Sequence, residues 1–186
     1  RWTGVLQRIA IVYLACAAIM ALRPGIALPI LATLGALILH SYLLLFVGSP
    51  DGYPPSLAPG EGISGWLDQN ALPGRVHRGT WDPEGVLSTL PAIASALIGV
   101  AVMRRISTKG LPTIWLGAIG AVLVAAGLAL TPWLPLNKNL WTASFTLVTS
   151  GFGLAFWAAL RTLWPLLEEF RLARLTVDMG QAALTL

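Results

Sequence analysis

The chain has 186 residues, of which 56% are hydrophobic and only 11% are charged. Because soluble domains carry about 25% charged residues, this composition excludes an ordinary soluble protein and indicates an integral membrane protein. The net charge of +4 comes from basic residues scattered over connecting segments, so we expect no nucleic-acid partner. A lone Cys16 excludes an intrachain disulfide and a cysteine-built metal site, and we expect no metal.

Long runs without charged residues predict the secondary structure. There are five such runs, and four of them reach the roughly 18 residues that a spanning helix needs. The remaining run, Ile9–Leu22, becomes long enough if Arg8 lies near the membrane surface. The five predicted spans are Gly4–Leu22, Ile26–Val47, Val86–Arg105, Leu111–Thr131 and Trp141–Pro165. The predicted fold class is therefore all-α, a polytopic transmembrane helical bundle.

The ends of the sequence indicate a piece of a longer protein. The first residue is Arg1, and Met179–Leu186 is typical of the opening of a sixth apolar span. We expect residues 1–186 to form a single integral-membrane domain. Within it, residues 48–85 are predicted to be an outward-facing loop, and residues 166–178 a cytoplasmic connector with an interfacial helix.

The distribution of basic residues predicts the orientation, because cytoplasmic loops are enriched in Lys and Arg. One side holds Arg23, Arg104, Arg105, Lys109, Arg161, Arg171 and Arg174, and the other holds Arg1, Arg8, Arg75, Arg78 and Lys138. The short-loop cluster 104–109 makes the first side cytoplasmic, so the long loop and the 137–139 connection share the outer face. Tryptophans near span ends are expected interfacial anchors: Trp2, Trp81, Trp133 and Trp141 outside, and Trp115 and Trp164 inside.

Asp82 and Glu84 directly precede the third predicted span. Asp is a good N-cap, Pro83 suits the first helical position, and Glu84 in the first turn would complement the helix dipole. A functional interpretation stays open beside this structural one. Groups that could pair with these carboxylates or bind an anionic substrate lie a few residues upstream: Arg75, His77 and Arg78.

Gln7 and Arg8 lie at the outer end of the first span. Arg8 either extends to the membrane surface or points into the bundle. In the second case it needs a counter-charge, because a charge in the membrane costs about 2.5–3.5 kcal/mol, and Asp82 or Glu84 is the expected partner.

Two further polar features lie in or next to the predicted spans. Asn137, Lys138 and Asn139 place a cation between two amides, which fits either a polar turn or a site for a hydroxyl- and amine-bearing ligand such as a sugar. His40 lies deep in the second span without a nearby charge, and we expect it to be packed and neutral rather than catalytic.

Three segments in this order and spacing carry a resemblance to a known family. The segments are Gly4–Ile9, Leu72–Leu90 with its Trp-Asp-Pro-Glu-Gly string, and Leu136–Thr142 with its Asn-Lys-Asn-Leu-Trp string. Together with the intervening spans they resemble the heparan-α-glucosaminide N-acetyltransferase family and its bacterial relatives, within the transmembrane acyltransferase superfamily. The resemblance covers most of residues 1 to 165. The chain differs from the family pattern at Gly74–His77, where bacterial relatives often have a Gly-His-Leu-Tyr string.

The resemblance implies a multi-pass N-acetyltransferase of the bacterial cytoplasmic (inner) membrane. Such a protein moves acetyl from acetyl-CoA on the cytoplasmic side to the amine of a glucosamine-type sugar on the outer face. The residues implied around the outer end of its site are Gln7, Arg8, Asp82, Glu84, Asn137, Lys138, Asn139 and Trp141. The family's catalytic histidine is expected upstream of residue 1, so neither His40 nor His77 is assigned as the base.

Two other interpretations remain at this stage. The protein could move a saccharide without modifying it, as a transporter or permease does, or it could be a non-catalytic membrane subunit. The expected partners under the first interpretation are an amino-sugar or cell-surface saccharide, acetyl-CoA and the lipid bilayer, with a homodimer as a possible assembly.

Overall fold

The structure is a computed structural model that describes residues 4–22, 25–72, 76, 79–167, 176 and 179. Over these residues the protein is all-helical and contains no strand, which confirms the predicted fold class. Its helices are α1 (Val5–Leu22), α2 (Ala27–Phe46), α3 (Gly62–Ala71), α4 (Val86–Lys109), α5 (Thr113–Ala129) and α6 (Ala143–Leu167).

Four helices, α1, α2, α4 and α6, are long and apolar enough to cross a membrane. The fourth predicted span, Leu111–Thr131, corresponds to the shorter α5, with 17 residues. It is shorter than predicted because its last turn gives way to a hydrogen-bonded turn, in which Leu134 N–H donates to the carbonyl of Leu130 at 2.9 Å. Helix α6 begins at Ala143, so Trp141 lies in the turn before it.

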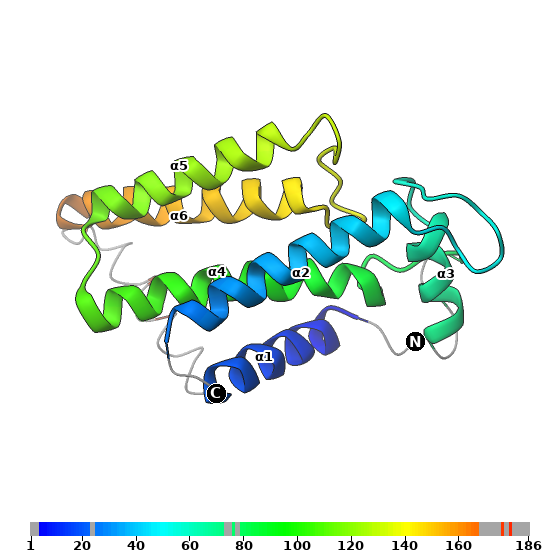
Figure 1. The fold of residues 1–186 in the computed structure, drawn as a ribbon. Helices are drawn as coiled ribbons and strands as arrows, with labels where there is room; N and C mark the ends of the chain where they lie inside the picture. The colour runs from blue at the N-terminus through cyan, green and yellow to red at the C-terminus, as the bar shows by residue number, and fades with distance from the viewer. Residues whose placement is uncertain are drawn as a thin grey trace.

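The polar connections gather at one end of the bundle (Figure 1). The beginnings of α1, α4 and α6 and the ends of α2 and α5 all lie at this end, together with α3. We call it the α3 end. The α4–α5 connection and the end of α6 lie at the opposite end. The long loop and the 130–142 connection therefore share one face of the molecule, as the basic-residue pattern predicts.

Helix α3 was not predicted. It lies within the long loop, where Gly and Pro are frequent and no long apolar run marks a helix. Its buried face consists mostly of small residues, Gly62, Ser64 and Gly65, which allow close contact with the neighbouring chain. The fourth buried residue is the carboxylate Asp68, which is only 2% exposed. Helix α3 thus carries a buried charge to the beginning of α4.

Helices α5 and α6 pack with their backbones almost in contact. A Cβ added to Gly120 would lie 2.7 Å from the carbonyl oxygen of Gly151, and one added to Gly127 would lie 2.8 Å from that of Ser144. Side chains larger than glycine are excluded at these points unless the helices separate. Around this contact, Leu116, Leu154 and other apolar residues form a buried cluster with α4.

Several predictions concern residues outside the described part of the chain. The connector predicted at 166–178 begins later than expected, because α6 continues through Leu167 with Pro165 inside it. The rest of the connector and the predicted sixth span lie outside the described residues, except for Thr176 and Met179. The same applies to other residues on which the predictions depend: Arg1, Trp2, Arg23, Arg75, His77, Arg78, Arg171 and Arg174.

Candidate functional site

The chain enters α4 through a tight turn formed by Asp82–Gly85. The N–H of Gly85 donates to the carbonyl of Asp82 at 2.9 Å, and the N–H of Glu84 donates to the Asp82 carboxylate at 3.0 Å. Asp at the first position and Pro at the second are the preferred residues for such a turn. The prediction that Asp82 caps this helix is therefore wrong. Helix α4 begins only at Val86, so both Asp82 and Glu84 lie before its first turn.

The carboxylate that caps α4 comes from Asp68 on α3. One oxygen accepts the N–H of Val86 at 3.0 Å, and the other accepts the N–H of Asp82 at 3.0 Å. Gly85 allows this approach, since a Cβ there would collide with the Asp68 carboxylate. A sequence signal for this arrangement exists, because a helix that begins after glycine has no side-chain cap of its own and needs one from elsewhere.

The electrostatic environment of Asp68 combines opposing effects. Burial raises the pKa of its carboxyl above the ordinary value, and the nearby charge of Asp82 acts in the same direction. The two backbone N–H groups and the guanidinium of Arg8 favour the ionised form and partly offset the burial. Asp82 is also buried, with 2% of its surface exposed. Two buried carboxylates thus share one local network of backbone N–H donors, and among the described residues Arg8 is the cation near them.

Arg8 points from α1 into the bundle, toward the beginning of α4. Its guanidinium donates to the carbonyl of Pro83 at 3.0 Å, to the hydroxyl of Ser88 at 2.8 Å and to the carbonyl of Ser88. The two expected counter-charges act at longer range, with Glu84 stronger than Asp82, and the unexpected Asp68 is weaker than both. Arg8 therefore connects α1 to the turn and first residues of α4 through neutral oxygen acceptors.

Trp141 completes this cluster from the turn that precedes α6. The centre of its ring lies 4.5 Å from the central carbon of the Arg8 guanidinium, a cation–π contact. Its backbone has φ 54°, a value that is uncommon for a bulky residue and costs conformational energy. The indole packs edge-on against Phe145, with 5.7 Å between ring centres. The left-handed turn at Trp141 directs its side chain toward α1.

We call the cluster of Arg8, Asp68, Asp82, Glu84, Ser88 and Trp141 the Arg8 site. It brings together four of the eight residues expected from the sequence, Arg8, Asp82, Glu84 and Trp141. A fifth, Gln7, is exposed and lines a cavity of about 230 Å³ that Arg8, Glu84 and Thr89 also border. Asp68 was missed because its role depends on a contact between segments far apart in the chain.

The remaining three expected residues lie in the turn between α5 and α6. The Asn137 side-chain oxygen accepts the N–H groups of Asn139 and Leu140, and its amide group donates to the carbonyl of Leu57 at 3.3 Å. Lys138 and Asn139 are exposed. Asn137 thus organises its own turn, and none of the described contacts of these three residues reaches the Arg8 site.

A groove of about 510 Å³ extends from the Arg8 site along α1 and α4. Arg8, Glu84 and Trp141 line it at one end, and Cys16 and Val100 line it farther along the two helices. The distance along α1 from residue 8 to residue 16 is about 12 Å at the usual helical rise. Apart from the residues at the α3 end, its walls are mainly apolar side chains such as Val12 and Ala96.

The two histidines do not join the described part of this site. His40 is 1% exposed and lies against the backbone of Leu140, and neither ring nitrogen has a standard hydrogen bond to another described residue. His77 lies outside the described residues. Within the described ranges, no group of three or more His, Cys, Asp or Glu side chains is placed to hold a metal.

Comparisons with known proteins do not add a family assignment. No protein-family model matches the chain, and no curated protein matches it.

Proposed function

We propose that this protein is a transmembrane acyltransferase of the bacterial cytoplasmic membrane. It would transfer acetyl from cytoplasmic acetyl-CoA to the amine of a glucosamine-type sugar on the outer face. The observation that carries the proposal is the meeting of Arg8, Glu84 and Trp141 at one end of an apolar groove. A few polar groups converging on an apolar pocket are typical of small-molecule sites.

The reaction requires a neutral amine and a polarised thioester. The amine nitrogen attacks the thioester carbonyl carbon, the carbon–sulfur bond breaks, and the CoA thiolate leaves while the amine proton passes to a base. We assign no base among the described residues. The described residues would bind and orient the reactants and stabilise developing charge.

Arg8 and Trp141 suit the stabilisation of an oxyanion. The Nε of Arg8 and the indole Nε1 of Trp141 are buried and have no hydrogen-bond acceptor among the described residues. Donors held in a site of low water content are strong stabilisers of a carbonyl oxygen that gains negative charge. A thioester carbonyl at the end of the groove would supply the acceptor that both donors need, after a small shift of the side chains around them.

Glu84 suits the recognition of the sugar amine. Its carboxylate is half-buried and lines both the apolar groove and the smaller cavity beside Gln7. An ammonium group at Glu84 would lie next to the proposed position of the thioester. The apolar length of the groove, about 12 Å along α1, would accept a flexible thiol-bearing arm that approaches from the opposite end of the bundle.

The direct test uses full-length protein in sealed vesicles. Labelled acetyl-CoA is supplied on one side and glucosamine on the other, and N-acetylglucosamine is measured by mass spectrometry. We expect acetylated sugar, and we expect Glu84→Gln to lower kcat/KM about tenfold or more because the ammonium loses its counter-charge. Lys138→Gln, at an exposed position in the α5–α6 turn, is the control and should retain activity.

Two results would contradict the proposal. Sugar that crosses the membrane without acetylation would favour a transporter. Acetyl transfer and glucosamine affinity that are both unchanged in Glu84→Gln would remove the carboxylate from its assigned role.

A further inference from the structure

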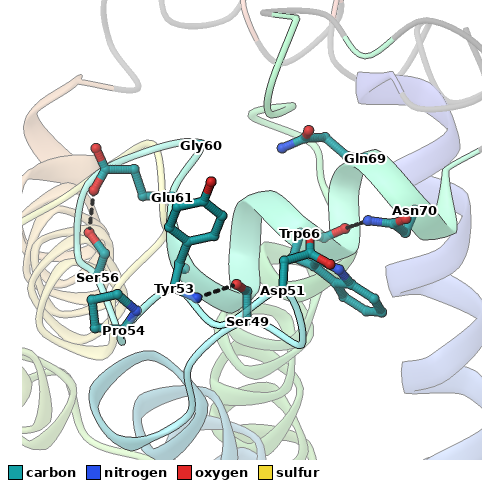
Figure 2. A pocket seen from close by; sticks show the side chains of 11 residues that line it. Ser49, Asp51, Tyr53, Pro54, Ser56, Gly60, Glu61, Trp66, Gln69 and Asn70 are labelled. Atoms are coloured by element: carbon teal, nitrogen blue, oxygen red, sulfur yellow. Dashed lines mark hydrogen bonds between the residues drawn. The ribbon is translucent and has the colours of Figure 1, made fainter.

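A second cavity lies at the α3 end, between the segment after α2 and the helix α3. Its volume is about 440 Å³. Figure 2 shows side chains from two parts of the chain around it, with Tyr53 and Glu61 from the loop and Trp66, Gln69 and Asn70 from α3. We call it the loop pocket. It shares no lining residue with the Arg8 groove.

The described lining of the loop pocket is negative. Asp51 and Glu61 contribute carboxylates, and among the described residues no Lys, Arg or His lines the pocket. Both carboxylates belong to exposed residues. A cavity of this kind attracts a cation and disfavours a phosphate or another anion.

The side-chain amide N–H groups of the loop pocket already donate within the protein, so the groups that remain available to a ligand are mainly acceptors. The amide group of Asn70 already donates to the carbonyl of Trp66 at 2.9 Å, and that of Gln69 donates to the carbonyls of Gly65 and Thr80. Their side-chain oxygens accept no hydrogen bond from another described residue, and the same is true of the Asp51 carboxylate. A complementary ligand must therefore bring donors, as a hydroxyl-rich molecule with an ammonium group does.

Two aromatic rings also line the loop pocket. Tyr53 and Trp66 provide flat apolar faces beside the carboxylates, and such faces also attract an ammonium group. Aromatic faces with neighbouring acceptors suit a pyranose ring, which has apolar C–H faces and polar hydroxyl edges. A simple metal ion would gain nothing from the rings.

The wall of the pocket is formed before any ligand binds. Ser49 N–H donates to the carbonyl of Tyr53 at 2.9 Å, and the hydroxyl of Ser56 donates to Glu61 at 2.8 Å. Gly60 fits closely against Thr80 and Trp81, since a Cβ there would lie 2.6 Å from the Thr80 hydroxyl oxygen. Binding therefore does not have to order the loop first. The same contacts connect the pocket to the segment that leads into Asp82.

We propose that the loop pocket binds a cationic saccharide, as an accessory subsite separate from the Arg8 site. The identification of this saccharide as the acetyl acceptor rests on the proposed function, whereas its binding does not. Helix α3 connects the two sites, because Asp68 caps α4 while its neighbours Gln69 and Asn70 line the loop pocket. A glucosamine oligosaccharide could thus hold one sugar in the loop pocket while another approaches Glu84.

The test measures binding without acetyl-CoA, by calorimetry on the full-length protein in lipid nanodiscs. The probe is the β-1,4-linked glucosamine disaccharide, and the neutral N,N′-diacetyl disaccharide is the reference ligand. The cationic disaccharide should bind more tightly, and the double variant Asp51→Asn, Glu61→Gln should weaken its binding about tenfold. Trp66→Ala should also weaken it, since the ring face is lost.

A charge-matched control excludes a general effect of net charge. Glu168→Gln with Glu169→Gln removes the same charge from the segment after α6 and should leave the affinity unchanged. Equal affinity for the two disaccharides, or unchanged affinity in the Asp51, Glu61 double variant, would overturn the proposal. Binding that depends on Asp51 and Glu61 in a protein without acetyl transfer would retain the subsite and reject the acyltransferase function.

Discussion

The α3 end contains two pairs of carboxylates that differ in burial. Asp68 and Asp82 are each 2% exposed and accept backbone N–H groups, whereas Asp51 and Glu61 are exposed in a cavity. All four lie within one loop and its short helix. In this comparison the two buried carboxylates are the ones that accept backbone N–H groups, whereas the two exposed ones line the loop pocket.

The difference follows from the desolvation of charge. A buried carboxylate is tolerated only when donors replace the water that it loses, and Asp68 obtains two N–H bonds and a nearby guanidinium. An exposed carboxylate keeps its water and has little effect on folding. Substitutions in the first pair should therefore change stability, and those in the second pair should change binding.

The largest effect is expected for Asp68→Ala. The substitution leaves the N–H of Asp82 without its acceptor in a buried location and the N–H of Val86 without its acceptor in a partly buried one. At roughly 1–3 kcal/mol for each of the two unsatisfied donors, the free energy of unfolding should fall by about 2–6 kcal/mol. Reversible unfolding in mixed detergent–lipid micelles measures it, with Asp51→Ala as the exposed control. A loss similar to that of the control would remove the distinction between the two pairs.

A somewhat smaller loss is expected for Arg8→Gln. The carbonyl of Pro83 and the carbonyl and hydroxyl of Ser88 lose a charged donor, and the buried carboxylates lose a cation. We expect a destabilisation of about 2–4 kcal/mol in the same unfolding assay. Arg8→Lys should lose about half as much, since a single ammonium cannot replace the fork of donors. Equal stability of all three proteins would show that Arg8 does not connect α1 to α4.

Gly85→Ala tests the close approach of the Asp68 carboxylate to the chain. The added Cβ would occupy the position of that carboxylate, so that Asp68 has to move away from its two donors. A loss of about 1–3 kcal/mol is expected from this overpacking. In a double-mutant cycle, the loss should nearly disappear when Asp68 is already Ala, because the collision partner is gone. Additive losses would place the effect elsewhere.

The smallest effect on stability is expected in the loop pocket. Asp51→Asn with Glu61→Gln should change the free energy of unfolding by no more than about 0.5 kcal/mol, as surface substitutions usually do. Thermal unfolding of the double variant beside wild type provides the measurement. A loss comparable to that of Asp68→Ala would mean that both pairs are structural.

Much of the helical bundle could be predicted from the sequence, and the reasons are physical. A charge such as Arg104 or Lys109 is costly inside a membrane, so charge-free runs mark the spans and basic residues mark their ends. Helix α3 escaped prediction because it is stabilised by contacts with α2 and α4 rather than by an apolar run of its own. Its buried residues are mainly glycine and serine, which by composition resemble a loop.

The candidate site was predictable only in part. Arg8 and Glu84 stood out as charges at the ends of spans, and Trp141 as an expected interfacial residue. Asp68 did not stand out, because it lies 18 residues before Val86, and the glycine at the start of α4 indicates a missing cap without indicating which residue supplies it. Asn137 looked like a ligand-binding amide, but its oxygen accepts the N–H groups of Asn139 and Leu140 within the turn. Local hydrogen bonding competes with ligand binding for the same polar atoms.

The close packing of α5 and α6 has a mechanical consequence for the Arg8 site. With Gly120 against Gly151 and Gly127 against Ser144, the two helices cannot slide past each other without separating, so they move as one rigid pair. Trp141 lies immediately before α6 and moves with that pair, whereas Arg8 belongs to α1. The contact between guanidinium and indole therefore joins α1 to the α5–α6 pair, and a displacement of α1 relative to that pair would lengthen it.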